Sequence, residues 1–317
     1  MLEHILVPRD GTPVVEQALA HADALAHALQ ARITLVRVVP EPTIQDRFVD
    51  PLVWQMRKSE SEADLIQAAE RLRSHGLEVQ TALLEHSGTE FVVKYAQENG
   101  IDLIVITSDI NTVSDVAHKL ITQTNIPTLI VRPTSQVAGE DFEVRYKNIF
   151  VPLDGSQRAE CVLPVASRLA EACEGKLILA HIVRKPEMPR RAPLAQEDYD
   201  LVARIVERNQ AEAEKYLEQV ATRLNVPVET HLLVGDNVVA SLHELMNQKN
   251  ADLVVLSAHG YSGQARWPYG STTTSFINYG PKPVLVVQDL PAVEPDLGQS
   301  DVSPREKQMP DNRYAAV

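Results

Sequence analysis

The residues best suited to chemistry are small or carry a hydroxyl group, and they follow an apolar run at residues 253–256: Ser257, Gly260, Gly263, Gly270, Ser271 and Thr272. The run is too short for a helix and predicts a strand that is buried on both faces. A strand, a glycine loop and a helix start, in this order, turn backbone N–H groups toward an anion, and glycine lets a phosphate approach the amides. The spacing favours a phosphate site, with an ordinary surface loop after a strand as the alternative.

The secondary-structure elements expected to position this loop occur twice in the chain. Residues 4–12 (HILVPRDGT) match residues 148–156 (NIFVPLDGS) at an offset of 144 positions. The match continues without a gap through the next predicted helix and strand. An internal repeat of this length predicts two domains of one fold.

Each half alternates short apolar runs with amphipathic stretches. Strands are expected at residues 5–7, 33–38, 79–84, 103–106 and 128–131, and at 149–151, 177–183, 228–234, 253–256 and 284–287. The connecting helices include 14–29 and 160–172, and an apolar stripe at residues 201–224 predicts a long helix packed on the core. Strands alternating with helices predict an α/β fold with two doubly wound, five-stranded parallel sheets.

The composition restricts the class of protein. The chain has 317 residues, 44% of them hydrophobic, and a net charge of −13, which argues against a general nucleic-acid binder or a binder of anionic membranes. No apolar run reaches membrane-spanning length, and residues 1–10 show no signal-peptide pattern. Cys161 and Cys173 fall in one predicted helix, so reduced thiols in a cytoplasmic protein are expected. The histidines are scattered, and no metal site is expected.

Three motifs carry a resemblance to a known family. The spacing Ser257-x2-Gly260-x9-Gly270-Ser271 resembles the nucleotide loop of the universal stress proteins, G-x2-G-x9-G-[S/T], with serine at the first glycine. The V-P-x-D-G-[S/T] motif in both halves and the strand P-V-L-V-V after the loop are also similar to that family. The chain is identified as a tandem universal stress protein, which implies a Rossmann-like, adenine nucleotide alpha hydrolase-like fold in each half.

The resemblance also implies a ligand and further site residues. It carries a role in the nucleotide pocket to Asp154 and Gly155, a backbone contact with adenine to Ile182, a turn beside the site to Gly235 and a loop-ordering role to His259. The implied ligand is ATP, with AMP or ADP as alternatives, and Mg²⁺ can accompany ATP. For Asp154 the residues themselves leave a second role open, because an Asp-Gly turn can also cap the following helix.

The two halves differ where the loop should lie. Twenty-six positions separate Ser257 from Pro283, but only 20 separate Thr107 from Pro127, and the shorter segment has no glycine and carries Asp109. A carboxylate there would repel phosphate. The expected organisation is a degenerate domain at residues 1–138, a nucleotide-binding domain at 145–290 and a disordered tail at 291–317.

The expected function is that of a cytoplasmic stress-response protein that binds a nucleotide in its second domain and regulates rather than catalyses. The chain has no G-x-x-x-x-G-K-[S/T] phosphate loop and no acid–base constellation, so it is not expected to be an enzyme. The alternative is a scaffold of the same fold that holds no nucleotide. The last strands of the two halves are too apolar to be left as bare edges. The resemblance implies that they pair antiparallel, either within one chain as a pseudo-dimer or across two chains of a homodimer.

Overall fold

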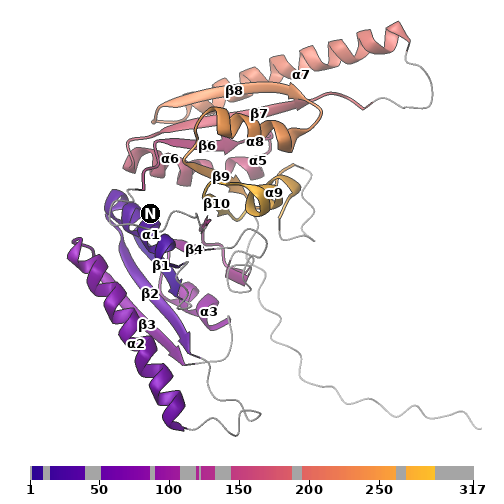
Figure 1. Ribbon diagram of the computed structural model, residues 1–317. Helices are drawn as coiled ribbons and strands as arrows, with labels where there is room; N and C mark the ends of the chain where they lie inside the picture. The colour runs from indigo at the N-terminus through magenta and orange to yellow at the C-terminus, as the bar shows by residue number, and fades with distance from the viewer. Residues whose placement is uncertain are drawn as a thin grey trace, which may run out of the picture.

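The two halves of the chain form one continuous β-sheet (Figure 1). The computed structural model describes residues 2–9, 15–39, 51–85, 90–107, 119–120, 123–132, 144–187, 195–261 and 269–289. The first half contains β1 (His4–Arg9), α1 (Val15–Leu29), β2 (Arg32–Val39), α2 (Pro51–Ser74), β3 (Val79–Glu85), α3 (Glu90–Glu98), β4 (Leu103–Thr107) and β5 (Thr128–Val131). The second half contains β6 (Asn148–Pro152), α5 (Gln157–Glu160), α6 (Leu163–Ala172), β7 (Lys176–Arg184), α7 (Gln196–Thr222), β8 (Val228–Gly235), α8 (Val238–Gln248), β9 (Leu253–Ser257), α9 (Ser271–Tyr279) and β10 (Val284–Val287).

The strand order β3-β2-β1-β4-β5-β10-β9-β6-β7-β8 shows how the halves join. Strand pairs inside each half are parallel, whereas β5 and β10 pair antiparallel, with Leu129 opposite Leu285. Both central strands are buried along their whole length. The predicted α/β fold is confirmed, and so is the antiparallel pairing of the last strands within one chain. The pairing removes two apolar edges that would otherwise invite aggregation.

Helices cover both faces of the sheet because neighbouring strand residues point to opposite sides. On one face Ile5 and Val7 pack with α1 and α2, while the corresponding strands of the second half pack with α6 and α7. On the other face Leu6 packs with α3, and the second half presents α8 and α9. Burial on both faces explains why the central strands are continuous apolar runs.

The helix predicted at residues 160–172 is wrong at its start. The structure has the short α5, then a break, and α6 beginning at Leu163 with a proline in its first turn. Pro164 has no N–H, and its ring would clash with the carbonyl four residues earlier, so a helix cannot continue through it but can begin there. Cys161 and Cys173 therefore terminate two different helices as C-caps instead of sharing one.

The apolar stripe of α7 is only partly core. Leu217 and Val220 are buried against the sheet, but Leu201 and Ile205 near the start of α7 are 52% and 37% exposed. Figure 1 shows why: the long helix extends past the end of the sheet, so its first turns have no strand beneath them. The expectation of core packing is wrong for this first part of the helix.

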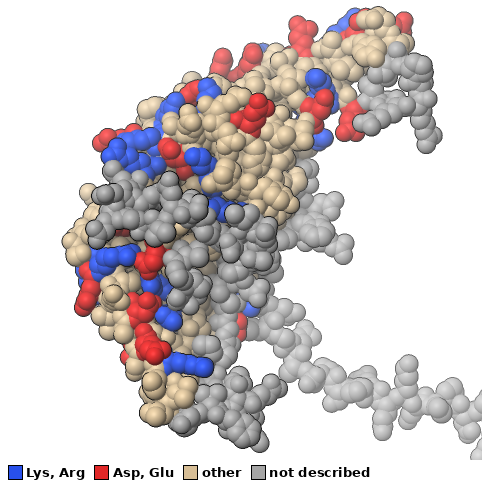
Figure 2. Space-filling model, viewed as in Figure 1, with Lys and Arg blue, Asp and Glu red and all other residues tan. Residues whose placement is uncertain are grey.

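Acidic and basic side chains are interspersed over the face shown in Figure 2, and the described residues there form no continuous basic surface. This pattern agrees with the net charge of −13. Among the described helices, none combines the length and the apolar character that a membrane span requires.

Candidate nucleotide site

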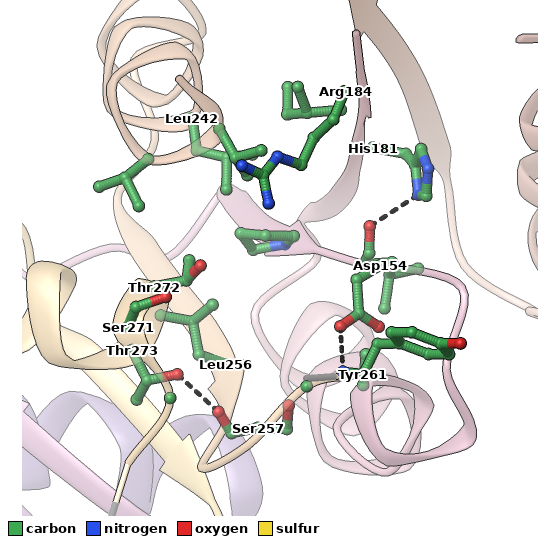
Figure 3. A pocket seen from close by; sticks show the side chains of 18 of the residues that line it. Asp154, His181, Arg184, Leu242, Leu256, Ser257, Tyr261, Ser271, Thr272 and Thr273 are labelled. Atoms are coloured by element: carbon green, nitrogen blue, oxygen red, sulfur yellow. Dashed lines mark hydrogen bonds between the residues drawn. The ribbon is translucent and has the colours of Figure 1, made fainter. Parts of the chain in front are cut away.

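A cavity of about 660 Å³ opens at the carboxyl ends of β6, β7 and β9 in the second half (Figure 3). Its walls come from the segment after β6, the end of β7, the start of α8 and the first turn of α9. Ligands of open α/β sheets bind at this edge, because the strand ends leave backbone groups and loops facing one crevice. The volume lies in the range of small-molecule sites, roughly 300 to 1,000 Å³.

The structure brings most of the predicted site residues together. The ones that line the cavity are Asp154, Ile182, Ser257, Gly260, Gly270, Ser271 and Thr272. Three predicted residues lie beside the cavity without lining it: Gly155, Gly235 and His259. Gly263 lies outside the described residues. The predicted residues that line the cavity come from four separate parts of the chain, which only the fold brings together.

Asp154 connects the end of β6 to the glycine loop. Its Oδ1 accepts hydrogen bonds from the backbone N–H and the hydroxyl of Ser156, at 3.0 and 2.6 Å. Its Oδ2 accepts from the backbone N–H of Tyr261, at 2.6 Å. The alternative role as a helix cap is wrong, because the cap of α5 is Ser156, whose Oγ accepts from the N–H of Ala159. The carboxylate at the cavity wall keeps lone pairs that can accept hydrogen bonds from a ligand hydroxyl or amino group.

Gly260 is required for space and not for unusual backbone angles. A Cβ at this position would lie 2.3 Å from Asp154 Oδ2 and 3.3 Å from its Cγ. The corresponding Cβ at Gly270 would meet only ordinary contacts of 3.7 Å or more, and Gly270 has a φ of −69°. Neither Gly260 nor Gly270 therefore has a backbone conformation that is closed to other residues. What Gly260 provides is the close approach of the loop to Asp154.

Three hydrogen bonds fix both ends of the glycine loop to the sheet. Ser257 Oγ donates to the carbonyl of His259 at 2.6 Å, and Thr273 Oγ1 donates to the carbonyl of Ser257 at 2.7 Å (Figure 3). The N–H of Gly270 donates to the carbonyl of Ala258 at 2.8 Å. The serine that replaces the family's first glycine thus directs its hydroxyl into the loop itself.

The start of α9 faces the cavity without a side-chain cap. Gly270 occupies the N-cap position and has no side chain that could accept from the first turn. Ser271, Thr272 and Thr273 line the cavity. The first N–H groups of a helix have no partner inside the helix and carry a partial positive charge, so this wall is suited to an anion.

His259 points away from the cavity into a buried polar contact. Asp289 Oδ1 accepts from both the backbone N–H and the Nδ1 of His259, at 3.0 and 2.8 Å, and the two side chains are almost completely buried. Arg158 of α5 approaches the second oxygen of Asp289 at 3.7 Å. This contact joins the loop after β9 to the residues after β10.

Gly155 and Gly235 contribute through the backbone. Gly155 has a φ of +82°, in the left-handed region that favours glycine, and it shapes the turn after Asp154. A Cβ on Gly235, the last residue of β8, would lie 3.0 Å from Ser241 Oγ and 4.0 Å from Ile182 Cγ2. Gly235 therefore allows the start of α8 to pack closely beside the cavity.

Sequence reasoning missed His181, which lies on β7 at the cavity wall. Its Nδ1 donates to the carbonyl of Leu153 at 2.9 Å, which leaves Nε2 as an acceptor in the neutral ring. Burial lowers the pKa of His181 below its ordinary value, although the carbonyl of Leu153 and the charge of Asp154 act in the opposite direction. The internal repeat could have drawn attention to His181, because a polar residue, Arg37, also stands at the matching position of the first half.

Arg184, Asp236 and Asn237 also line the cavity and were not predicted as site residues. Figure 3 shows the Arg184 guanidinium extending from the end of β7 over the cavity. Asn237 caps α8, since its Oδ1 accepts from the N–H of Ala240 at 3.1 Å. An asparagine directly before a helical pattern is a cap signal, but nothing local to Arg184 indicates where its side chain reaches.

A second cavity, of about 480 Å³, lies at the matching strand ends of the first half. The repeat places Pro8 where the second half has Pro152, and both line their cavities. The polar residues differ, however. Arg9 replaces Leu153, so the first half presents a guanidinium where the second half has an aliphatic side chain.

Comparisons with known proteins agree with this architecture. The model of the universal stress protein family matches residues 1–132 and 145–288. A putative universal stress protein of Staphylococcus aureus strain USA300 is 32% identical over 155 residues, which is 47% of this chain and 89% of that protein. The corresponding protein of strain NCTC 8325 has the same identity and coverage.

Two solved structures share the fold over nearly the whole chain. A universal stress protein from Archaeoglobus fulgidus superposes with a TM-score of 0.65 at 15% identity, covering 91% of this chain and 99% of that one. A functionally unknown protein from Pseudomonas aeruginosa PAO1 superposes with a TM-score of 0.62 at 15% identity, covering 90% and 92%. The chain therefore belongs to the universal stress protein family and carries the family domain twice, in tandem.

Proposed function

We propose that this protein binds one adenine nucleotide, preferentially ATP, in the cavity of its second half, and that it acts as a cytoplasmic stress-response regulator. The observation that carries the proposal is the pair of facing walls, with Asp154 on one side and the uncapped start of α9 on the other. One wall accepts hydrogen bonds and the other donates them to an anion. An adenine nucleotide has both kinds of partner, ribose and amino groups at one end and phosphates at the other.

The polar groups of the cavity are arranged for binding more than for reaction. His259, the histidine inside the loop, is buried and bonded to Asp289, so it is not directed at a ligand. The described residues contain no group of three His, Cys, Asp or Glu side chains that could hold a metal ion. Mg²⁺ would accordingly arrive with the phosphates of ATP. Regulation through the bound or unbound state requires no fast hydrolysis.

The proposal of one nucleotide per chain rests on the different chemistry of the first half. There the strand ends carry Arg9, which is almost completely buried and bonded to Asp64 and Glu16. A nucleotide at that place would meet this ion pair where the second half has the aliphatic Leu153. Asp10, which matches Asp154, lies outside the described residues. The shorter loop after β4, with Asp109, falls outside the described residues, and its effect on phosphate stays a prediction.

Mass spectrometry of ligands released from freshly purified protein tests the proposal. Recovery of ATP, ADP or AMP at about one molecule per chain would support it. If no nucleotide is recovered, titration calorimetry with ATP and Mg²⁺ decides, and a chain that binds none of the three nucleotides would be a scaffold of the same fold.

A further inference from the structure

The cavity of the first half has its own polar chemistry and is not a weaker copy of the nucleotide site. Most of its lining is apolar and comes from the ends of β1, β2 and β4 and from the helices α1, α2 and α3 beside them, including Pro8, Val15, Val36, Val38, Val92 and Ile106. Its volume of about 480 Å³ is sufficient for a small organic molecule. Mainly apolar walls with a few convergent polar groups are typical of ligand sites.

A network of charged side chains borders the cavity. Asp64 accepts from Arg9 and from Arg37, and Glu16 accepts from Arg9 and pairs with Arg71 at 2.7 Å. Three guanidinium groups thus share two carboxylates, so one positive charge is uncompensated within the network. Burial alone would raise the pKa of Asp64, but hydrogen bonds and proximity to Arg9 and Arg37 outweigh it and hold that pKa below its ordinary value. The carboxylates of Asp64 and Glu16 are thus both paired with guanidinium groups of the network.

Arg37 is the member of the network that can still bind a ligand. Its Nη1 donates to Asp64 Oδ2 at 2.8 Å, and its side chain keeps 21% of its surface accessible at the cavity wall. Its Nε and Nη2 have no partner among the described residues. These two donors form one side of the planar guanidinium, the geometry that holds two oxygens of a carboxylate, phosphate or sulfonate.

Helix α2 adds a cation, a flat ring and one carboxylate, that of Glu60, to the same cavity. Trp54, Arg57 and Ser61 lie at positions i, i+3 and i+7 and therefore share one side of the helix, and all three line the cavity. Within the described part of the chain Arg57 forms no ion pair. Trp54 is held in place by Lys58, whose Nζ lies 5.7 Å from the ring centroid and pairs with Glu85 at 2.6 Å.

We propose that the first-half cavity binds a small organic anion with a flat apolar group. Its charged oxygens would lie on the open side of Arg37, within reach of Arg57. Its flat group would lie beside Trp54 among the valines. Because this site is in the other half, the proposal stands independently of nucleotide binding in the second half.

The position of the cationic group within the cavity argues against a nucleotide as this ligand. In the second half the groups suited to phosphate are at the end of β9 and the start of α9. In the first half Arg37, the guanidinium with an open side, is on β2, the strand that corresponds to β7. The anionic group is therefore expected on the opposite side of the crevice. If ATP bound here in the orientation proposed for the second half, its adenine would lie beside Arg37, where a negatively charged group is expected.

The test uses 8-anilinonaphthalene-1-sulfonate, an anion with flat rings, and the fluorescence of Trp54. The chain has two tryptophans, so a Trp267→Phe protein reports on Trp54 alone. The expected result is saturable quenching of Trp54 with one probe per chain, and at least a fivefold weaker Kd in Arg37→Gln and Arg57→Gln on that background. Arg168→Gln removes an exposed arginine of the second half, whose one ion pair among the described residues is with Glu171, and should bind like the parent.

Arg57→Gln is the variant less prone to misfold, since Arg57 forms no ion pair with the described residues whereas Arg37 does. A thermal unfolding scan of each variant shows whether a variant with a weaker Kd is still folded. Excess ATP with Mg²⁺ should leave the Trp54 signal unchanged. The proposal is overturned if Trp54 is not quenched, if Arg37→Gln and Arg57→Gln both bind like the parent, or if ATP displaces the probe.

Discussion

The backbone of Gly260 lies so close to the carboxylate of Asp154 that a Cβ on the glycine would come within 2.3 Å of Asp154 Oδ2. The two residues are far apart in the chain, and the neighbouring N–H of Tyr261 donates to the same oxygen. This contact closes the glycine loop against the end of β6. It couples the two walls of the proposed nucleotide site.

Gly260→Ala is expected to weaken ATP binding by at least tenfold, about 1.4 kcal/mol, because the methyl group must displace either the loop or Asp154. Gly280→Ala is the matched control. A Cβ there would lie 2.6 Å from the carbonyl oxygen of Phe276, at the far end of α9, so it also clashes, in this case with the backbone and outside the cavity. Titration calorimetry and thermal unfolding on both variants separate the two effects. Equal ATP affinity in the two variants would contradict the account of the loop.

Asp289→Ala is expected to weaken ATP binding although Asp289 does not line the cavity. The substitution removes the acceptor that holds both the backbone and the ring of His259, and with it one support of the loop. Asp252→Ala serves as the control, because Asp252 also accepts from backbone N–H groups, those of Lys147 and Asn148, at the opposite edge of the sheet. Both variants should lose stability, but only Asp289→Ala should change the Kd for ATP.

His21→Gln is expected to flatten the dependence of stability on pH between about 6.5 and 4. His21 of α1 is hydrogen-bonded to Tyr146, across the junction of the halves, and burial lowers the pKa of His21 to about 4. The unfolded chain therefore takes up this proton first as the pH falls. Stability that is present above pH 6.5 is lost progressively down to pH 4, by up to about 3 kcal/mol.

Urea unfolding of the parent and of His21→Gln at pH 7 and pH 4.5 measures this difference. The pKa of His4, His181 and His243 is also lowered by burial, but these residues are the same in both proteins. His27→Gln removes an exposed histidine of the same helix and should keep the parent's pH dependence. A His21→Gln protein with the parent's slope would show that the His21–Tyr146 contact does not control acid stability.

Much of the fold could be predicted because the sequence repeats its own pattern. The offset between the halves indicated that both contain the same elements in the same order along the chain. The apolar character of β5 and β10, together with the family resemblance, indicated that they pair. The break before α6 was missed because Pro164 was included in one long helical pattern. The exposed start of α7 was missed because apolar spacing defines a face of a helix but does not indicate how far the sheet extends beneath it.

The site could be predicted as a set of motifs but not as a geometry. Asp154, Gly260, Gly270 and Ser271 follow from spacing and the family resemblance, and the fold brings them to one cavity. The reason for Gly260 could not be predicted, because the atom it avoids belongs to a distant residue. The same limit applies to Arg184, since the direction of a long side chain depends on packing around it.

The most direct test of the central claim is a calorimetric titration of the full chain with ATP and Mg²⁺, beside the same titration of Gly260→Val. A side chain at position 260 forces the loop or Asp154 to move, and valine adds more bulk than alanine, so it is expected to disrupt the second-half site and to leave the first half unchanged. The parent should bind one ATP per chain, and the variant should show no measurable binding. Two sites in the parent, or one ATP still bound by a folded Gly260→Val protein, would contradict it.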